Sequence, residues 1–232
     1  WKLVILLDAW EVDTSAAGAN IMIADGTENT IRGSYVARIY DPESVVLSED
    51  GMTVEDSEKL HKYDGAFYSK MSMNVDGGEA GTGVLNITAD NEGLDTELHL
   101  TIQSGVINIF SGNDGINTNE DGVSVTTING GALSIQVTGE TGEGDGIDSN
   151  GYLVINGGTV TAAACSQSAD AGLDADKGIL INGGTVTTAA CADSMDSGLD
   201  ADKGIYINGG TVTASGNMYD QIDGGGQNYA VL

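Results

Sequence analysis

The stretch Ile181-Asn182-Gly183-Gly184-Thr185-Val186 decides the fold, because it occurs three times in the chain. Identical copies begin at Ile155 and Ile207, and looser copies begin at Ile102 and Ile128. The steps between the leading isoleucines are 26, 27, 26 and 26 residues. A constant period of this length is typical of repeat proteins, in which each repeat packs only on its neighbours.

Within each repeat the apolar residues alternate with polar ones, which indicates short β-strands. Ile179 and Ile181, and then Val186 and Thr188, share one side of this pattern. The runs end at Gly, Asn or Asp, the residues that make tight corners. We therefore predict an all-β fold, a right-handed parallel β-helix with coils of about 26 residues stacked about 4.8 Å apart. The spacing fits neither leucine-rich repeats nor a nine-residue calcium roll.

We expect one domain over residues 1–232, with irregular coils over 1–90 and regular coils over 91–225. The irregular part contains the only segment that suggests a helix, from Met52 to Tyr63. Two cysteines do not make a disulfide scaffold. Cys165 and Cys191 lie 26 residues apart and should stack. We expect two small side chains at a tight corner rather than a disulfide, because adjacent parallel strands give poor disulfide geometry.

A second motif, Gly-[Leu/Ile]-[Asp/Asn], recurs in phase with the first and predicts a column of acidic residues along one corner. Stacked carboxylates about 4.8 Å apart repel by roughly 1 kcal/mol in water and by more at a lower dielectric. Calcium would relieve this repulsion, since it takes six to eight oxygen ligands. The alternative is a solvated acidic edge that keeps the protein soluble. The predicted calcium ligands are Asp95, Asn117, Asp145, Asp148, Asp170, Asp174, Asp176, Asp196, Asp200, Asp202 and Asp223.

The outward positions of the repeat suggest two further surfaces. Val154, Leu180 and Tyr206 precede inward isoleucines and should form an exposed apolar stripe, with Tyr152 nearby. Such a stripe is covered by another segment or chain, or it is a platform for sugar rings, with Tyr152 and Tyr206 as the binding residues. Outward Thr-x-Thr pairs recur in three coils. Such arrays can bind ice, but β-branched residues are also favoured on sheet exteriors, which is the simpler reading.

Charge restricts the partners that this chain can have. It carries 35 acidic and 8 basic residues, for a net charge of −27. Nucleic acids and anionic membrane surfaces require a cationic footprint, so neither is an expected partner. No run of 18 apolar residues occurs, so we expect no membrane insertion.

The sequence does not contain a clear set of candidate catalytic residues. His61 and His99 have no recurring partner. A polysaccharide lyase needs a base within hydrogen-bond reach, and Lys177 and Lys203 are the only bases in the regular coils. The preceding residues, Asp176 and Asp202, should keep both lysines protonated.

The repeated pattern resembles the carbohydrate-binding β-helix family of clostridia and related gut bacteria. The stretches that carry the resemblance are Asp25 to Thr30, Phe67 to Lys70, Asn113 to Ile116 and the three Ile-Asn-Gly-Gly-Thr-Val copies. The resemblance implies a pectate-lyase-like right-handed β-helix, calcium along the coil corners, binding of cellulose or acidic sugars, and no established catalytic activity. It also implies secretion and attachment to the cell surface of a Gram-positive bacterium.

The resemblance transfers the calcium corner to Asp148, Asp174 and Asp200. The chain departs from the family at Lys177 and Lys203 and over 40–63, so no sugar site is transferred there. Together the residues and the resemblance predict an extracellular, non-catalytic protein that binds acidic or cellulosic polysaccharide and is stabilised by calcium. A calcium-dependent polysaccharide lyase and an adhesive surface solenoid remain alternatives, and the sequence leaves the oligomeric state open.

Overall fold

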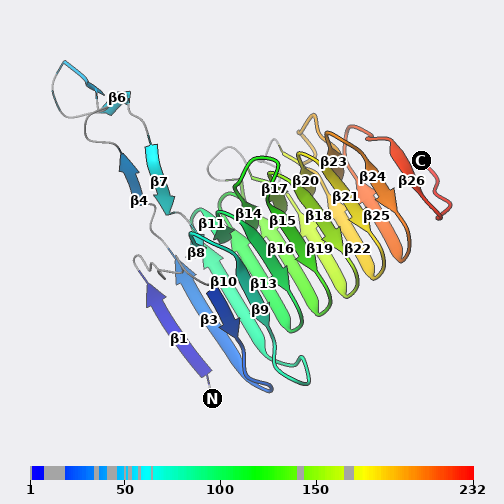
Figure 1. Cartoon of the computed structure of the whole chain (residues 1–232), viewed down its shortest axis with the longest axis horizontal. Coiled ribbons are helices and arrows are strands. Elements are labelled where there is room, and N and C mark those ends of the chain that lie inside the picture. Colours follow the sequence, from blue (N-terminus) through cyan, green and yellow to red (C-terminus); the bar gives the residue numbers. More distant parts are fainter. Residues whose placement is uncertain are drawn as a thin grey trace.

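The computed structural model describes residues 2–7, 19–33, 37–40, 46–49, 51, 54–56, 59–63, 65–139, 144–164 and 170–232. Three parallel sheets wrap around a common axis and form a β-solenoid (Figure 1). The described residues contain no helix, and so none that could span a membrane. The predicted all-β parallel solenoid with coils of about 26 residues is confirmed.

From β3 to β24 each coil contributes one strand to each of three sheets, which we call sheets A, B and C in the order in which the chain passes through them. Sheet A contains β1 (Lys2–Leu7), β3 (Glu28–Gly33), β10 (Val84–Ala89), β13 (Val106–Ser111), β16 (Ala132–Val137), β19 (Thr159–Ala163), β22 (Thr185–Ala189) and β25 (Thr211–Ser215). Sheet B contains β8 (Gly65–Ser69), β11 (Glu92–Thr96), β14 (Ile116–Thr118), β17 (Ile147–Ser149), β20 (Leu173–Ala175) and β23 (Leu199–Ala201). Sheet C contains β2 (Ala19–Met22), β9 (Met73–Asp76), β12 (His99–Ile102), β15 (Val125–Ile128), β18 (Tyr152–Ile155), β21 (Gly178–Ile181), β24 (Ile205–Ile207) and β26 (Ile222–Gly225).

The leading isoleucines of the repeat form one buried column in sheet C. Strand register pairs each with the next, and none is more than 8% exposed. The members of the column are Ile102, Ile128, Ile155, Ile181 and Ile207. The predicted stacking of apolar residues is therefore confirmed, and burial of these side chains is the main driving force for coil stacking.

The Gly-Gly corner between sheets C and A explains why the repeat keeps its second glycine. Gly158, Gly184 and Gly210 adopt φ values of 85°, 88° and 86°, a region that residues with a Cβ rarely enter. A Cβ on Gly184 would also lie 2.6 Å from the carbonyl oxygen of Gly158 in the preceding coil. Only glycine satisfies both the backbone conformation and the close stacking of successive corners.

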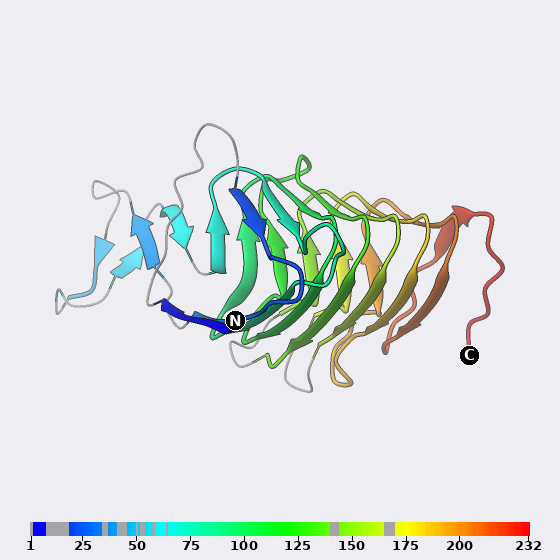
Figure 2. The same ribbon diagram turned by 90° about the horizontal axis from the view of Figure 1, so that it is seen from below.

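A ribbon of short antiparallel strands interrupts the solenoid between β3 and β8 and extends beyond its N-terminal end (Figure 2). In it β4 (Ala37–Tyr40) pairs with β7 (Lys59–Tyr63), and β5 (Val46–Leu47) pairs with β6 (Val54–Asp56). The helix predicted from Met52 to Tyr63 is therefore wrong. Its helix-favouring Glu, Lys and Leu residues are overridden because pairing with β4 and β5 satisfies the backbone groups of this segment.

Candidate metal centre and outer faces

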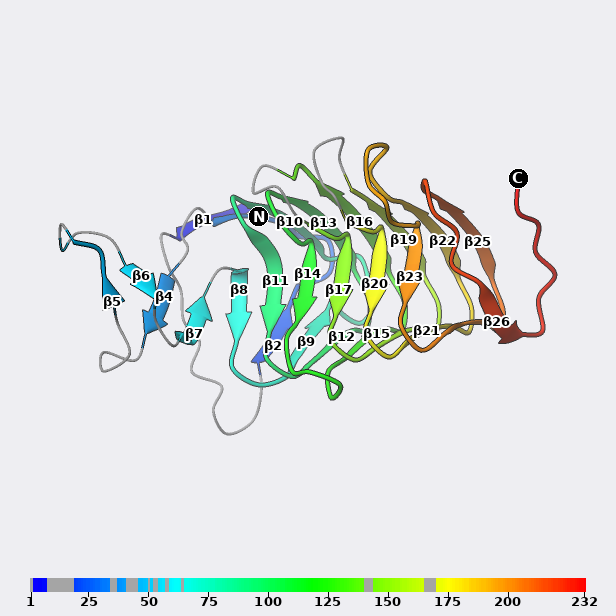
Figure 3. The same ribbon diagram turned by 90° about the horizontal axis from the view of Figure 1, so that it is seen from above.

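The strands of sheet B lie side by side along the solenoid (Figure 3), and the acidic column follows them. Register pairs Asp95 with Asn117, Asn117 with Asp148, and Asp174 with Asp200. Ile147 pairs with Leu173, which places Asp148 and Asp174 on adjacent strands as well. The leucine or isoleucine before each member points inward and is buried, so the following acidic residue must point outward.

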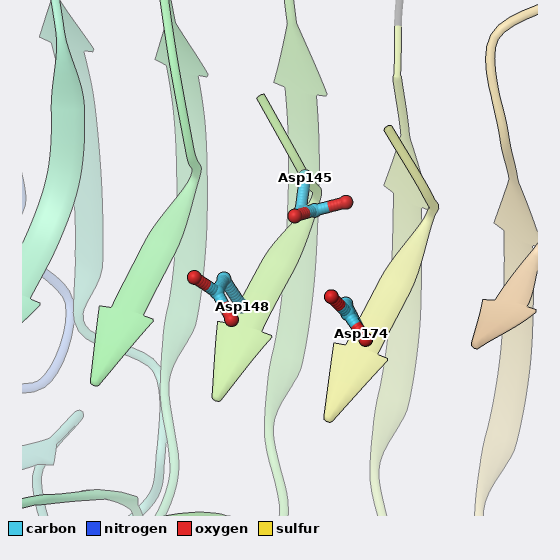
Figure 4. Close-up of side chains that lie close together, drawn as sticks. All are labelled: Asp145, Asp148 and Asp174. Carbon is cyan, nitrogen blue, oxygen red and sulfur yellow. The ribbon is translucent and has the colours of Figure 1, made fainter. Parts of the chain in front are cut away.

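Three of these carboxylates converge on one point. One oxygen each from Asp145, Asp148 and Asp174 lies within 4.8 Å of the other two (Figure 4). Calcium binds oxygens at 2.3–2.6 Å, so two ligands of one ion can lie up to about 5.2 Å apart. The spacing of the three oxygens is therefore close to what a shared calcium requires. Three carboxylates leave the remaining positions of a six- to eight-fold shell to other oxygens.

Backbone N–H groups from neighbouring coils hold the carboxylates at this corner. Ala171 donates its N–H to Oδ1 of Asp145 at 2.6 Å, one coil away. Asp145 in turn donates its own N–H to Oδ1 of Asp114 at 2.7 Å, and Gly144 donates to Oδ2 of Asp170 at 2.7 Å. These bonds fix the position of Asp145 in the cluster and tie three successive coils together.

Burial and mutual repulsion disfavour the ionised form of the three carboxyl groups at this corner. Burial, followed by repulsion from Asp174 and Asp176, raises the pKa of Asp148 to about 7. Burial also raises the pKa of Asp174 to about 6, although a hydrogen bond from the backbone of Ala175 opposes that shift. The pKa of Asp145 rises well above its usual range for the same reason, with Asp114 as the nearest like charge. A cation at this point would reverse these shifts, because it favours the ionised carboxylates.

The two N-terminal members of the column lie in a different environment. Asp95 and Asn117 are buried, with 1% and 7% of their surfaces exposed. Asn119 donates its amide N–H to Oδ1 of Asp95 at 2.6 Å, and Asn117 donates to Oε1 of Glu92 at 3.3 Å. In these coils asparagine amides contact the acidic residues, so the predicted metal ligands Asp95 and Asn117 lie outside the three-carboxylate cluster.

The remaining predicted ligands surround the cluster or extend it by one coil. Asp170 raises the pKa of both Asp145 and Asp148, so it lies close to both. Asp176 and Asp202 are exposed at the ends of their strands. Asp200 and Asp196 belong to the next coil, where burial and then a hydrogen bond with Asp220 raise the pKa of Asp200 to about 7.

The predicted position of Asp223 in the acidic column is wrong. Asp223 belongs to β26 of sheet C, where its Oδ2 accepts a hydrogen bond from the N–H of Ile205 at 3.1 Å. Asp220 lies beside Asp200 instead, and its Oδ2 accepts from the N–H of Ala201 at 3.1 Å. The prediction failed because the Ile-Asp pair of the last coil matches the motif while its strand joins a different sheet.

The sequence reasoning also missed Asp114. Its phase could have identified it, because Asp114-Gly115-Ile116-Asn117 has the same order as Asp145-Gly146-Ile147-Asp148. The expected stacking of the two cysteines cannot be followed, since Cys165 lies outside the described residues. Cys191 is buried, as expected for a small side chain at a corner.

Both predicted sugar-contact tyrosines lie on the outer side of sheet C and are partly exposed, Tyr152 at 44% and Tyr206 at 40%. The ring of Tyr152 covers Gly178, its partner on the next strand. The ring of Tyr206 likewise lies between Gly204 and Gly224. Tyr152 and Tyr206 are two coils apart, about 9.6 Å along the axis. Because the neighbour of Tyr152 on β21 and the neighbour of Tyr206 on β26 are both glycines, no side chain lies beside either ring on these strands.

The middle strands of sheet C carry no outward carboxylate. From β12 to β24 the outward residues are His99, Thr101, Val125, Thr127, Tyr152, Val154, Leu180 and Tyr206, together with Gly178. Asp76 on β9 and Asp223 on β26 lie on the two strands that flank this stretch. The predicted apolar stripe is present, because Val154 and Leu180 are half-buried and precede Tyr206 in the same row.

Two of the residues considered for catalysis, His99 and Lys177, make contacts with neighbouring coils or loops. Nδ1 of His99 accepts the N–H of Val125 at 3.1 Å. The side chain of Lys177 lies against Gly122, since a Cβ there would meet its Cε at 2.8 Å and its Nζ at 3.2 Å. Lys177 thus packs on the loop after β14.

These features define a class: an acidic parallel β-solenoid with a three-carboxylate corner on one side and, on another, exposed tyrosines on strands that carry no outward carboxylate. The chain belongs to the carbohydrate-binding domain-containing protein family, whose model matches residues 11–223. Neither a curated relative nor a solved structure matches the chain. The family confirms the carbohydrate-binding part of the resemblance, and the pectate-lyase-like fold remains a prediction.

Proposed function

We propose that this chain is an extracellular, non-catalytic protein that binds polysaccharide on the outer side of sheet C and is stabilised by calcium at Asp145, Asp148 and Asp174. One observation carries the proposal: a chain of net charge −27 presents, from β12 to β24, a stretch of sheet C with no outward carboxylate and two exposed tyrosines. Sugar rings pack on aromatic faces, whose hydroxyl groups also offer hydrogen bonds. Membership of a carbohydrate-binding family supports the same conclusion.

The ligand that best fits this face is a neutral, cellulose-like chain that runs along the solenoid axis. Tyr152 and Tyr206 are about 9.6 Å apart in that direction, close to the length of a disaccharide. The half-buried Val154 and Leu180 precede Tyr206 in its own row, which is two residues along the strands from the row of Tyr152. An acidic polysaccharide would be repelled by the protein as a whole, and it would bind only where calcium bridges its carboxylates to those of sheet B.

Calcium has a structural role in this proposal. The carboxylates of Asp148 and Asp174 come from adjacent coils, so one ion would join the coils and remove their mutual repulsion. An ion that binds only the folded chain stabilises it by mass action, by about 2.7 kcal/mol at a concentration one hundred times its Kd.

A lyase is less well supported by the same contacts. The base of such an enzyme must reach the proton beside the sugar carboxylate. Lys177 packs on Gly122, and Nδ1 of His99 is engaged by Val125. Lys203 is exposed and directly follows the exposed Asp202.

Depletion binding to insoluble cellulose tests the proposal. Tyr152→Ala and Tyr206→Ala should each weaken binding by up to about tenfold, the loss expected for one aromatic contact. Tyr229→Ala, which removes an exposed ring in the C-terminal tail, is the matched control and should bind like the wild type. Unchanged binding by the Tyr152→Ala/Tyr206→Ala double variant would exclude sheet C as the site.

A further inference from the structure

The outer side of sheet A is uncharged over six consecutive strands. Three outward positions on each of β10, β13, β16, β19, β22 and β25 make eighteen, and none is Asp, Glu, Lys or Arg. At the overall charged fraction of 19%, about three of the eighteen would be charged, and more would be expected on a surface. The strands are in register throughout, so these positions form straight rows.

The C-terminal half of this face is a regular array of threonines. Thr159, Thr185 and Thr211 form one row, and Thr161, Thr187 and Thr213 form the next. All six are exposed. Within the part of the chain that the structure describes, none of the six hydroxyls makes a side-chain hydrogen bond. The array therefore offers methyl groups for contact and six hydroxyls for hydrogen bonding.

We infer that this threonine face is a second polysaccharide-binding surface, so that one molecule can bridge two polysaccharide chains. The inference goes beyond the proposed site on sheet C and depends on it for the second point of attachment. Sheets A and C are different sides of one solenoid, so a chain bound to one does not block the other (Figures 1 and 2). The rows repeat about every 4.8 Å along the axis, near the length of one sugar residue.

A neutral polysaccharide fits this face better than a second copy of the protein. The six threonines, on strands about 4.8 Å apart and at positions about 6.7 Å apart, cover roughly 200 Å². A stable protein interface needs about 800 Å² on each partner, with aromatic or Arg residues at its centre. The threonine face is about a quarter of that size and has no such anchor, since the exposed aromatic ring of sheet A, Phe110, lies on β13, outside the threonine array. Hydroxyls without a partner instead suit a ligand that is itself covered with hydroxyls.

The test separates binding from bridging in a suspension of cellulose microfibrils. Thr161→Glu/Thr187→Glu places two charges at the centre of the threonine face. Lys203→Glu is the matched control, because it makes the same change in net charge at an exposed position off that face. Thr161→Val/Thr187→Val keeps the branched side chains that favour strands and removes only the hydroxyls. Depletion measures binding, light scattering measures bridging, and sedimentation without cellulose detects self-association.

The wild type and Lys203→Glu should bind and bridge. Both threonine variants should still bind through sheet C but lose bridging, and their apparent affinity for the suspension should fall by roughly 10²-fold as avidity is lost. Tyr152→Ala/Tyr206→Ala should retain weak binding through sheet A without bridging. Wild-type bridging by both threonine variants would overturn the inference and leave the proposed function intact. Failure of the wild type to bind would overturn both, and bridging explained by self-association in the absence of cellulose would overturn the inference alone.

Discussion

Asn182 donates its side-chain N–H to Oδ1 of Asn156, one coil earlier, at 2.8 Å. The same bond recurs along the corner between sheets C and A with distances from 2.8 to 3.2 Å. The members of this amide ladder are Asn74, Gln103, Asn129, Asn156, Asn182 and Asn208. Every donor points toward the preceding coil, so each amide dipole is aligned with the next and strengthens it. The asparagine of the repeat therefore joins coils as well as making a corner.

Asn182→Asp should destabilise the protein by about 1 kcal/mol, the usual net contribution of one hydrogen bond. The aspartate still accepts from Asn208 but places an oxygen against Oδ1 of Asn156 where the wild type has a donor. The free energy of unfolding in urea measures the loss. Asn228→Asp, an exposed residue in the C-terminal tail, makes the same chemical change and should have little effect. Equal stability of the two variants would argue against a structural role for the ladder.

Asp174→Asn should have opposite effects with and without calcium. In the metal-free protein at pH 8 it removes a charge that is repelled by Asp176, Asp202 and Asp196, so the melting temperature should rise. With saturating calcium it removes a ligand, so the stabilisation by calcium should shrink by about 1 kcal/mol or more. Asp202→Asn, an exposed neighbour, should keep the response to calcium. A full response in Asp174→Asn would remove this residue from the site.

The metal-free protein should become less stable as the pH rises from about 4 to about 7. Burial raises the pKa of Asp148 to about 7 and of Asp174 to about 6 in the folded chain, from 3.8 in the unfolded chain. Between these values the folded state binds more protons, so stability falls with increasing pH. Each such proton contributes at most about 1.4 kcal/mol per pH unit.

Calcium should reverse this dependence, because protons compete with the ion for the same carboxylates. Urea unfolding at pH 5 and pH 8, with calcium and after its removal, gives the four values needed. Greater stability at pH 8 than at pH 5 in the metal-free protein would contradict the assignment of raised pKa values to this corner.

Gly184→Ala should destabilise the protein by more than 1 kcal/mol. The φ of 88° is unfavourable for alanine, and its Cβ would meet the carbonyl oxygen of Gly158 at 2.6 Å. Gly226→Ala is the control, since a Cβ there meets no atom within 4 Å. Thermal unfolding of both variants gives the comparison, and a similar small change in each would show that the corner tolerates a side chain.

The repeat made the solenoid predictable because its period, its apolar alternation and its glycine corners all indicate the same coil. Ile102 and Ile207 could be placed in one column 105 residues apart because each step between them is one coil. The segment from Met52 to Tyr63 has no repeat, so only its local helix propensity could be read. Its pairing with β4 and β5 depends on contacts that are distant in sequence.

The candidate site was predictable in position but not in detail. Register alone places Asp148 beside Asp174, and the same motif predicted both residues. The sequence also predicted Asp145, which comes just before the corner, but it could not show the N–H of Ala171 in the next coil that holds the Asp145 carboxylate. The sequence also could not show that Asp220, and not Asp223, lies beside Asp200. The last coil has no strand in sheet B, so the Ile-Asp motif there does not mark the acidic corner.

Because the coils are in register, the length of the molecule can change in evolution without changes to the core, the corners or the outer faces of the existing coils. A duplicated unit of 26 residues would enter between two coils whose faces it already matches. It would add one isoleucine to the core, one amide to the ladder and one row to each outer face, while every existing contact kept an equivalent partner. The number of coils, rather than the substitution of any single residue, therefore sets how long a segment of polymer such a protein can span.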